Sequence, residues 1–386
     1  MSSVRQRGET FTAYWFVTVN GKRVQRTKGG FKKETAAKRH GQEQEVAARA
    51  PGYREPTDKK LTVAQLLDEH WLPHFRTTAT RSGEPPRANT IAQVEIAVKS
   101  WVKPYVGEER VLALTPVHVE QMIATLRARG GRKGKPLGER GIQAAYIVLR
   151  RALDFAVLRG FAPTNVAAVV GRPGVKQREM SCWTAEEAQA FLHASAEDRL
   201  YAAWVLLLAR GLRRGELAGL RWDAIDLEAG HLRITRTRVS IGGKVIDSTP
   251  KTRAGRRRIP LDAGLIAVLK AHRDRQRFEA RGWGESWAES GYVFVREDGA
   301  PLHPESISQR FDRLIAKHKL SRIRLHDCRH TAASLMLEDG TPVKVAAEML
   351  GHSNPNVTQA TYQHVLPGMA ESAGERLSGR LLGGLR

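Results

Sequence analysis

The stretch IRLHDCRHTAASL, residues 323–335, mixes charged and apolar residues in one short amphipathic run. On a helix, residues three and four positions apart lie on one face, so the run predicts that His326, Arg329 and His330 project together. An apolar stripe would lie beside them, made of Leu325, Cys328, Ala332 and Leu335. The run therefore predicts a charged face on a helix that is anchored by its apolar side.

Three interpretations of this face are open from the run alone. A single histidine on a helix usually belongs to a solvated surface. His326 and His330 have the i, i+4 spacing of two zinc ligands, with Asp327 placed as a base, although Arg329 would repel a dication. In the third interpretation Arg329 binds a phosphate while His326 moves a proton.

The charge of the whole chain is that of a protein with a polyanionic partner. Its 386 residues carry a formal charge of +23 and a pI near 10.5, which favours DNA or RNA, with an anionic membrane surface as the alternative. No apolar run approaches the roughly 18 residues of a spanning helix, and the start MSSVRQRGETF lacks the apolar stretch of a signal peptide. We therefore expect a cytoplasmic protein without a membrane partner. The two cysteines, Cys182 and Cys328, argue against a disulfide framework or a cysteine-based zinc site.

The sequence predicts a multidomain, mainly α protein with α+β parts. In residues 1–57, aromatic and β-branched residues flank Asn20-Gly21, a hairpin signal, and a helical pattern follows over 34–48. We expect a three-stranded sheet plus a helix. The first 60 residues hold 14 Lys and Arg against 6 Asp and Glu, so this module either contacts phosphates or serves as a solubilising appendage.

Two larger domains are predicted to follow. Residues 58–175 read as an all-helical domain: Thr62 and Gln65 suit a capping box, and a helix is expected from Thr115-Pro116 to Gly130-Gly131. Residues 176–386 begin with a second capping box, Thr184 with Glu187, and read as mostly helical. A period-two pattern that turns at Gly242-Gly243 predicts a small sheet or hairpin within them.

Five short motifs follow one another in the third segment and carry a family resemblance. They are GLRRGEL (211–217), PKTRAGRRRIPL (250–261), LHDCRHTAA (325–333), LGHS (350–353) and TYQHV (361–365). Over residues 184–365 their order and spacing strongly resemble the tyrosine recombinase family, also called phage integrases. The arrangement of the two preceding segments is similar to integrases of the three-domain type, with a helical core-binding domain and an arm-binding N-terminal module.

The resemblance implies a role for each side chain of the site. Arg213 and Arg329 would hold the scissile phosphate, and Glu216 would orient Arg213. Guanidinium groups suit this task because they grip phosphate oxygens in bidentate geometry and stay charged at any working pH. His326 would take the first position of the His-x-x-Arg box.

The other implied residues act on the reacting oxygens. Tyr362 would be the nucleophile, forming a 3′-phosphotyrosyl intermediate, and His352 would be the later histidine. Lys251 would act on the leaving oxygen, with Lys244 of the same hairpin as its competitor. This chemistry requires no cofactor, metal or ATP.

The resemblance implies a site-specific DNA recombinase that integrates or excises a mobile element. Its partners would be double-stranded DNA at core and arm attachment sites, three further copies in a tetramer, and accessory excision or DNA-bending factors. The tail AESAGERLSGRLLGGLR, residues 370–386, would dock on a neighbouring subunit. The alternatives are a noncatalytic DNA-binding regulator, a type IB-like topoisomerase, and a metal-dependent nuclease built on His326, Asp327 and His330.

Overall fold

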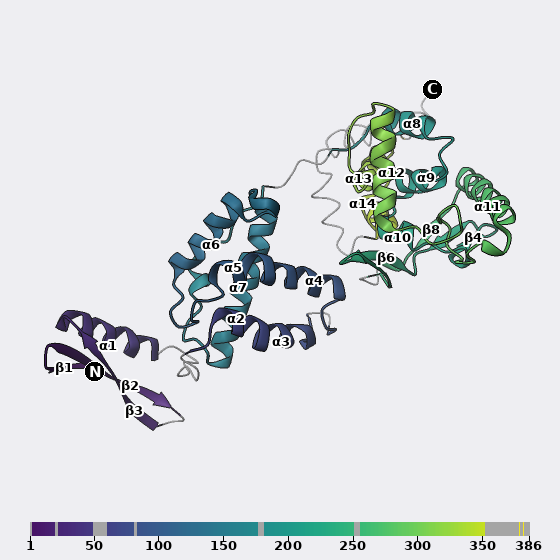
Figure 1. Ribbon diagram of the computed structural model, residues 1–386. Helices are drawn as coiled ribbons and strands as arrows, with labels where there is room; N and C mark the ends of the chain where they lie inside the picture. The colour runs from purple at the N-terminus through teal and green to yellow at the C-terminus, as the bar shows by residue number, and fades with distance from the viewer. Residues whose placement is uncertain are drawn as a thin grey trace. The chain divides into compact units, whose positions relative to one another are not determined.

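The structure is a computed structural model, and it describes residues 2–19, 22–48, 60–80, 83–176, 181–250, 255–351, 378 and 381. The chain divides into two compact units, residues 1–177 and 178–386 (Figure 1). The predicted domain boundaries after residues 57 and 175 stay predictions. In the part of the chain that the structure describes, every helix is too short or too polar to cross a membrane.

The first unit begins with the predicted three-stranded sheet and its helix, which confirms this part of the fold. The strands are antiparallel in the order β1-β2-β3, and α1 lies against them (Figure 1). Successive residues of a strand point to opposite faces, so alternate residues of β2, Ala13, Trp15 and Val17, form a small core with Ala37 of α1. The elements are β1 (Ser3–Arg7), β2 (Thr10–Val19), β3 (Lys22–Phe31) and α1 (Glu34–Ala48). Asn20 and Gly21 lie outside the described residues, between the paired Val19 and Lys22.

The rest of the first unit is helical, as predicted. Thr62 and Gln65 form the expected capping box, and α6 begins after Thr115 and buries Val119, Met122, Ile123 and Leu126. The elements are α2 (Val63–Gln65), η1 (Leu66–Trp71), α3 (Leu72–Thr77), α4 (Ala88–Ala97), η2 (Val98–Val102), α5 (Lys103–Val106), α6 (Pro116–Arg129), η3 (Arg132–Gly134), α7 (Glu139–Arg159) and η4 (Val166–Ala168).

Two of these segments, η1 and η2, are π-helical, and each stands just before a proline. Pro73 and Pro104 lie at the start of the α-helical turns that follow. Proline has no N–H to donate, and its ring clashes with the carbonyl four residues earlier. A wider π-helical turn relieves that clash without ending the helix.

The second unit is mostly helical around an aromatic core. Its largest buried side chains include Phe191, Trp204 and Phe311, and the rings of Phe191 and Phe311 lie 5.1 Å apart between centroids. Thr184 and Glu187 form the second predicted capping box. The helical elements are α8 (Ala185–Ala194), α9 (Tyr201–Arg210), α10 (Arg214–Ala218), η5 (Trp222–Ala224), α11 (Ala263–Trp283), η7 (Gly284–Ser286), α12 (Pro304–Lys317), α13 (Asp327–Glu338) and α14 (Val343–Leu350).

Two small sheets accompany these helices, which confirms the predicted α+β character. Strands β4 (Ile225–Asp226), β5 (His231–Arg233) and β8 (Arg258–Pro260) form one sheet, and β6 (Thr237–Ile241) with β7 (Lys244–Ser248) forms a hairpin. The hairpin turns at Gly242-Gly243, both with positive φ, as their sequence predicts.

The hairpin is held against the unit by close packing and by polar contacts. A Cβ at Gly219 would lie 3.0 Å from the Cα of Thr237, so the absence of a side chain there lets β6 approach α10. The Tyr292 hydroxyl donates to Asp247 of β7 at 2.6 Å, and Asp247 pairs with Arg238 of β6 at 3.0 Å. Lys244 begins β7 with its side chain exposed.

Candidate active site

Four of the seven predicted site residues lie in the described part of the chain, and all four belong to the second unit. They are Arg213, Glu216, His326 and Arg329. Lys251, His352 and Tyr362, together with the tail apart from residues 378 and 381, lie outside the described residues.

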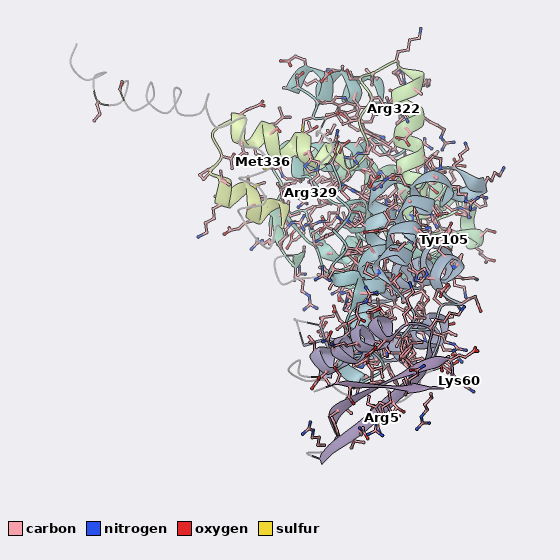
Figure 2. All side chains as sticks on the ribbon, turned by 90° about the vertical axis from the view of Figure 1, so that its left-hand side faces the viewer. Arg5, Lys60, Tyr105, Arg322, Arg329 and Met336 are labelled. Atoms are coloured by element: carbon pink, nitrogen blue, oxygen red, sulfur yellow. The ribbon has the colours of Figure 1, made fainter. Side chains whose placement is uncertain are left out.

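Arg329 is buried, which rules out the solvated-surface interpretation for this residue. Its side chain lies on α13, which packs against α9, and Figure 2 labels its position. Arg329 is 3% exposed, and its Nη1 donates to the carbonyl of Gly211 at 2.8 Å. A buried guanidinium is costly unless it is well paired, so its position indicates a specific task.

Gly211 is the residue that shapes this contact. It ends α9 in the left-handed conformation, with φ of +61°, and a Cβ there would lie 2.4 Å from Cδ2 of Leu350. Glycine alone adopts this backbone without strain and leaves room for α14. The end of α9 therefore meets α13 and α14 at one point.

Glu216 is the acidic centre of the site. It is 2% exposed and accepts from the Arg213 backbone N–H at 2.9 Å and from Arg213 Nη1 at 2.7 Å. Arg257 donates to both its oxygens, at 2.9 and 3.0 Å. Burial alone would raise the pKa of Glu216, but the bonds from Arg257 and the charges of both arginines hold that pKa below its usual range.

Both arginines also hold the end of α14. Arg213 Nη2 donates to the carbonyl of Gly351 at 2.9 Å, and Arg257 Nε donates to the carbonyl of Met349 at 2.6 Å. These carbonyls lie at a helix C-terminus, where they lack partners within the helix and the helix dipole is negative. The side chain of Arg213 is still 38% exposed, so it can also reach a ligand.

His326 is the N-cap residue of α13 and lies just before its first turn. The helix begins at Asp327, so the expectation that His326, Arg329 and His330 share one helical face is only partly right. The rings of His326 and His330 are in edge contact, with centroids 5.2 Å apart. Arg329, on the same helix, is buried.

The His326 imidazole is neutral at physiological pH in this arrangement. Partial desolvation by the surrounding protein, together with the positive groups of His330, Arg329 and Arg213, lowers its pKa to about 4. Its side chain keeps an exposed edge. A neutral imidazole can accept a proton.

His326 opens onto a pocket of about 770 Å³. Positive side chains from α10 and from the loop before α13 line this pocket, and His326 and Asp327 form part of its wall. The lining residues are Ser181, Arg214, Ser308, Asp312, Arg322, Ile323, Arg324, Leu325, His326 and Asp327. Space beside His326 is therefore open to a large anionic ligand.

Asp327 is fully engaged and is poorly suited to serve as a base. Its Oδ2 accepts from the backbone N–H and Nε of Arg324, and its Oδ1 accepts from Nη2 of Arg324. Burial would raise its pKa, but these bonds hold the pKa below its usual range. The geometry therefore disfavours the interpretation in which Asp327 activates water beside a metal.

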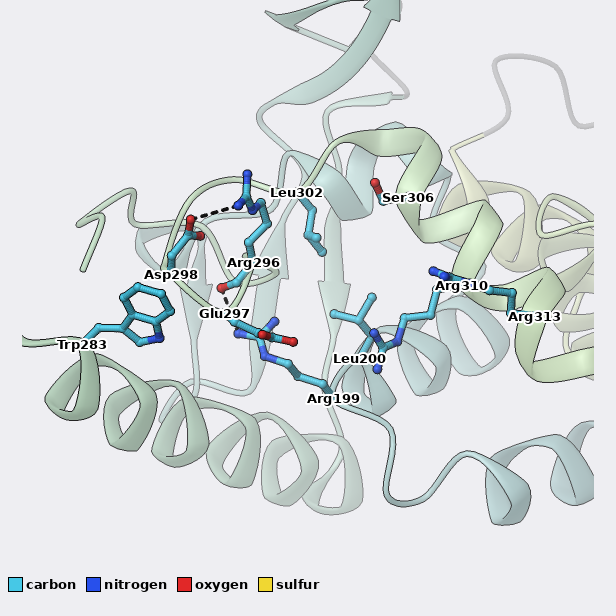
Figure 3. Close-up of a pocket in the computed structure, with 10 residues that line it drawn as sticks. All are labelled: Arg199, Leu200, Trp283, Arg296, Glu297, Asp298, Leu302, Ser306, Arg310 and Arg313. Atoms are coloured by element: carbon cyan, nitrogen blue, oxygen red, sulfur yellow. Dashed lines mark hydrogen bonds and ion pairs between the residues drawn. The ribbon is translucent and has the colours of Figure 1, made fainter. Parts of the chain in front are cut away.

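A second pocket of the same unit, about 300 Å³, has a different character (Figure 3). Three of its four arginines are paired with carboxylates: Arg199 with Glu279, Arg310 with Asp198 at 2.8 Å, and Arg296 with Asp298 at 3.1 Å. These pairs offset the charges that an anion would need. The pocket beside His326 is the better candidate site.

Arg257 is the site residue that the sequence reasoning missed. It lies in a run of three arginines, Arg256 to Arg258, before a buried Ile259. Because side chains alternate along a strand, Arg257 points to the same side as Ile259, and this alternation is the signal that could have singled it out. Its burial confirms the pattern, since the Arg257 side chain is 6% exposed.

Comparisons with known proteins find similarity to integrases and tyrosine recombinases. The profile of the phage integrase family matches residues 182–368. A tyrosine recombinase XerC-like protein of Caldanaerobacter subterraneus subsp. tengcongensis is 32% identical over 61% of this chain and 65% of its own length. An integrase of Streptomyces ambofaciens is 26% identical over 90% of this chain and 89% of its own. The chain thus spans just under two thirds of the XerC-like relative.

A solved structure has the same fold. The integrase of transposon Tn1549, in complex with transposon right end DNA, superposes on 82% of this chain and all of its own, with a TM-score of 0.66 and 20% identity. Because 82% of the chain is more than either unit alone, the similarity includes residues of both units, and it confirms the predicted mostly helical, multidomain architecture.

Proposed function

We propose that the chain is a site-specific DNA recombinase of the tyrosine recombinase family, because its residues 182–368 match the profile of the phage integrase family. It would cleave and rejoin DNA to integrate or excise a mobile element. The observation that carries the proposal is the junction at which Arg329 donates to Gly211 and Arg213 donates to Glu216 and Gly351, in the same unit as a neutral His326 that lines an open, basic pocket.

The proposed reaction exchanges one phosphate ester for another. The phenolic oxygen of Tyr362 attacks the scissile phosphorus, a Tyr–O–P bond forms, and the bond from phosphorus to the 5′ oxygen breaks. His326 accepts the phenolic proton or donates a hydrogen bond to the phosphate, and Lys251 supplies a proton to the departing 5′ oxygen. The phosphotyrosine keeps the energy of the broken bond for the rejoining step.

The two arginines would stabilise the charge that develops on the nonbridging oxygens. Arg213 presents a partly exposed guanidinium, and Arg329 is held rigidly by Gly211, so the first can adapt to the phosphate while the second is preorganised. Glu216 would orient Arg213. His352, which follows Gly351 in the chain, would be the remaining histidine of the site.

The proposed partner is double-stranded DNA, contacted at core sites by the helical domain and at arm sites by the N-terminal module. The formal charge of +23 supports a polyanionic partner. We further propose a cytoplasmic location, a tetramer on DNA, and accessory excision or bending factors. Lys251 is preferred to Lys244 as the hairpin lysine because it falls within the matched motif.

The decisive experiment traps the covalent intermediate. Duplexes that carry the attachment site, selected by the protein from a randomised pool, are nicked next to the cleavage point and incubated in EDTA. A denaturant-resistant protein–DNA adduct is expected with the native chain and with Tyr201→Phe, a control in the same unit, and none with Tyr362→Phe. Site-specific binding without any adduct would favour the noncatalytic regulator.

The same reactions separate the remaining alternatives. Relaxation of supercoiled DNA without site preference would indicate a type IB-like topoisomerase. Cleavage that EDTA abolishes, and that leaves no protein on the DNA, would indicate the metal-dependent nuclease.

A further inference from the structure

We infer that Arg257 is a positioning residue that ties the phosphate-binding arginine Arg213 to the end of helix α14. The inference rests on the proposed function for its effect on DNA cleavage, while its structural half can be tested without DNA. It concerns three segments that are far apart in the chain: the start of α10, the start of β8 and the end of α14.

All three guanidinium nitrogens of Arg257 donate hydrogen bonds within the protein. Nη1 and Nη2 donate to the two oxygens of Glu216, and Nε donates to the carbonyl of Met349. The side chain is 6% exposed, and these bonds engage all three of its guanidinium nitrogens, so a DNA phosphate would have to compete with Glu216 and Met349 for them. Arg257 therefore acts through its neighbours and not on the substrate. A lysine could not reproduce three donors in this planar arrangement.

Arg213 mirrors this arrangement on the other side of Glu216. It donates to Glu216 and to the carbonyl of Gly351, two residues beyond Met349. Glu216 is thus shared by two guanidinium groups, and each of them also holds one carbonyl at the end of α14. The single acidic centre links α10, β8 and α14.

The charges of this cluster explain why a second arginine is needed. Glu216 carries one negative charge, which by itself would cancel that of Arg213. With Arg257 also bound to Glu216, the cluster keeps a net positive charge that a phosphate can use. The same positive charge lies at the negative end of the α14 dipole, where it is favourable.

The position of the α14 end matters because His352 follows Gly351 directly in the chain. Gly351 already closes the helix through its own N–H to Ala347 and Glu348, with φ of +70°. The contacts of Arg213 and Arg257 with the Gly351 and Met349 carbonyls are additional to that cap. They fix the position of the helix end relative to Arg213. Buried ion pairs are a weak source of stability, so this arrangement suits a positioning role.

The test begins with hydrogen exchange in the protein without DNA. Arg257→Ala should speed exchange of the amides of residues 347–351 by about tenfold or more, because a hydrogen bond from a charged donor is lost. Arg257→Lys keeps a charge beside Glu216 and should show the same local effect with little loss of thermal stability. Arg210→Ala is the matched control, since Arg210 also donates to a carbonyl, of Pro260, and to a carboxylate, of Asp262. Unchanged exchange in Arg257→Lys would overturn the inference.

The second measurement is single-turnover adduct formation with the nicked duplex. Arg257→Ala should slow adduct formation by about a hundredfold in the native chain. In a chain that already carries His352→Ala, the same change should slow it by less than about threefold, because Arg257 would act through the position of His352. Equal losses in the two backgrounds would mean that Arg257 does not act through the α14 end. If the native chain forms no adduct at all, the proposed function fails, while the exchange result still decides the structural coupling.

Discussion

Arg213 and Arg329 are both proposed to hold the scissile phosphate, yet the protein holds them differently. Arg329 is buried and donates to the Gly211 carbonyl, whereas Arg213 is shared between Glu216, the Gly351 carbonyl and open space. This difference predicts different costs for removing them. Loss of Arg329 should lower both stability and catalysis, and loss of Arg213 mainly catalysis.

Replacing either arginine by alanine should slow adduct formation by about 10²–10³-fold, the usual effect of removing a donor that stabilises developing charge. Binding to the duplex should weaken far less, because many other basic residues share the phosphate contacts. Rates and dissociation constants are measured with the same duplex. Arg322→Ala, at the exposed rim of the pocket, is the control and should affect binding alone. Parallel losses of rate and affinity in Arg213→Ala would instead make Arg213 an ordinary DNA contact.

His326 offers a prediction about pH. Its folded pKa of about 4 lies below its unfolded value near 6.5, so the folded state favours the neutral ring. Its contribution to stability is present above pH 6.5 and is lost as the pH falls toward 4. An NMR titration of the ring nitrogens should show a midpoint near 4, with His326→Asn identifying the signal.

Two changes should move that midpoint upward. His330→Ala removes a positive neighbour, and bound DNA adds a negative phosphate, so each should raise the pKa of His326. A midpoint at or above 6.5 in the free protein would show that His326 is not desolvated as the structure indicates.

At the scale of elements, the meeting point of α9, α13 and α14 depends on one residue without a side chain. Gly211→Ala would place a Cβ 2.4 Å from Leu350, in a left-handed conformation that disfavours alanine. Leu350 is fully buried, so its side chain has little room to move. The junction therefore tolerates no substitution at this position without rearrangement.

We expect Gly211→Ala to lower the free energy of unfolding by about 1–3 kcal/mol, from the left-handed conformation and overpacking together. Urea unfolding of the intact chain measures it. Gly242→Ala is the control for backbone strain alone, because its φ is +56° and a Cβ there would meet no neighbour. If the two variants lose equal stability, the contact with Leu350 has no energetic importance.

For the molecule as a whole, the hydrophobic cores of the two units share no residue. The helical core of the first unit includes Leu149, and the aromatic core of the second includes Phe311. A third, smaller cluster joins α13 to α14 through Ala333, Leu337, Ala346 and Leu350. Separate cores predict separate cooperative unfolding.

Differential scanning calorimetry should therefore resolve more than one transition. Leu149→Ala and Phe311→Ala should each destabilise one unit by about 2–5 kcal/mol, which shifts its midpoint by about 2–4 °C for each kcal/mol. Each substitution should leave the other transition in place. A single transition that both variants shift equally would show that the units unfold together.

Local signals made much of this fold predictable from the sequence. The capping boxes at Thr62 and Thr184, the start of α6 after Thr115, and the turn at Gly242-Gly243 all follow from contacts within a few residues. The order of the motifs indicated the family resemblance for the same reason, since each motif is short and self-contained. Charge and composition needed no structure to predict a polyanionic partner.

Contacts between distant residues were beyond the sequence. Arg329 reaches a carbonyl 118 positions away, and Arg257 reaches Glu216 from 41 positions away and Met349 from 92. Whether an arginine lies in solvent or in a buried cluster depends on which carbonyls and carboxylates surround it once the chain is packed. The sequence by itself determined many of the elements, the family resemblance and the candidate residues. Only the tertiary structure decided which charges are buried, which are paired and which remain open to a phosphate, because those energies depend on distance in space and on local desolvation.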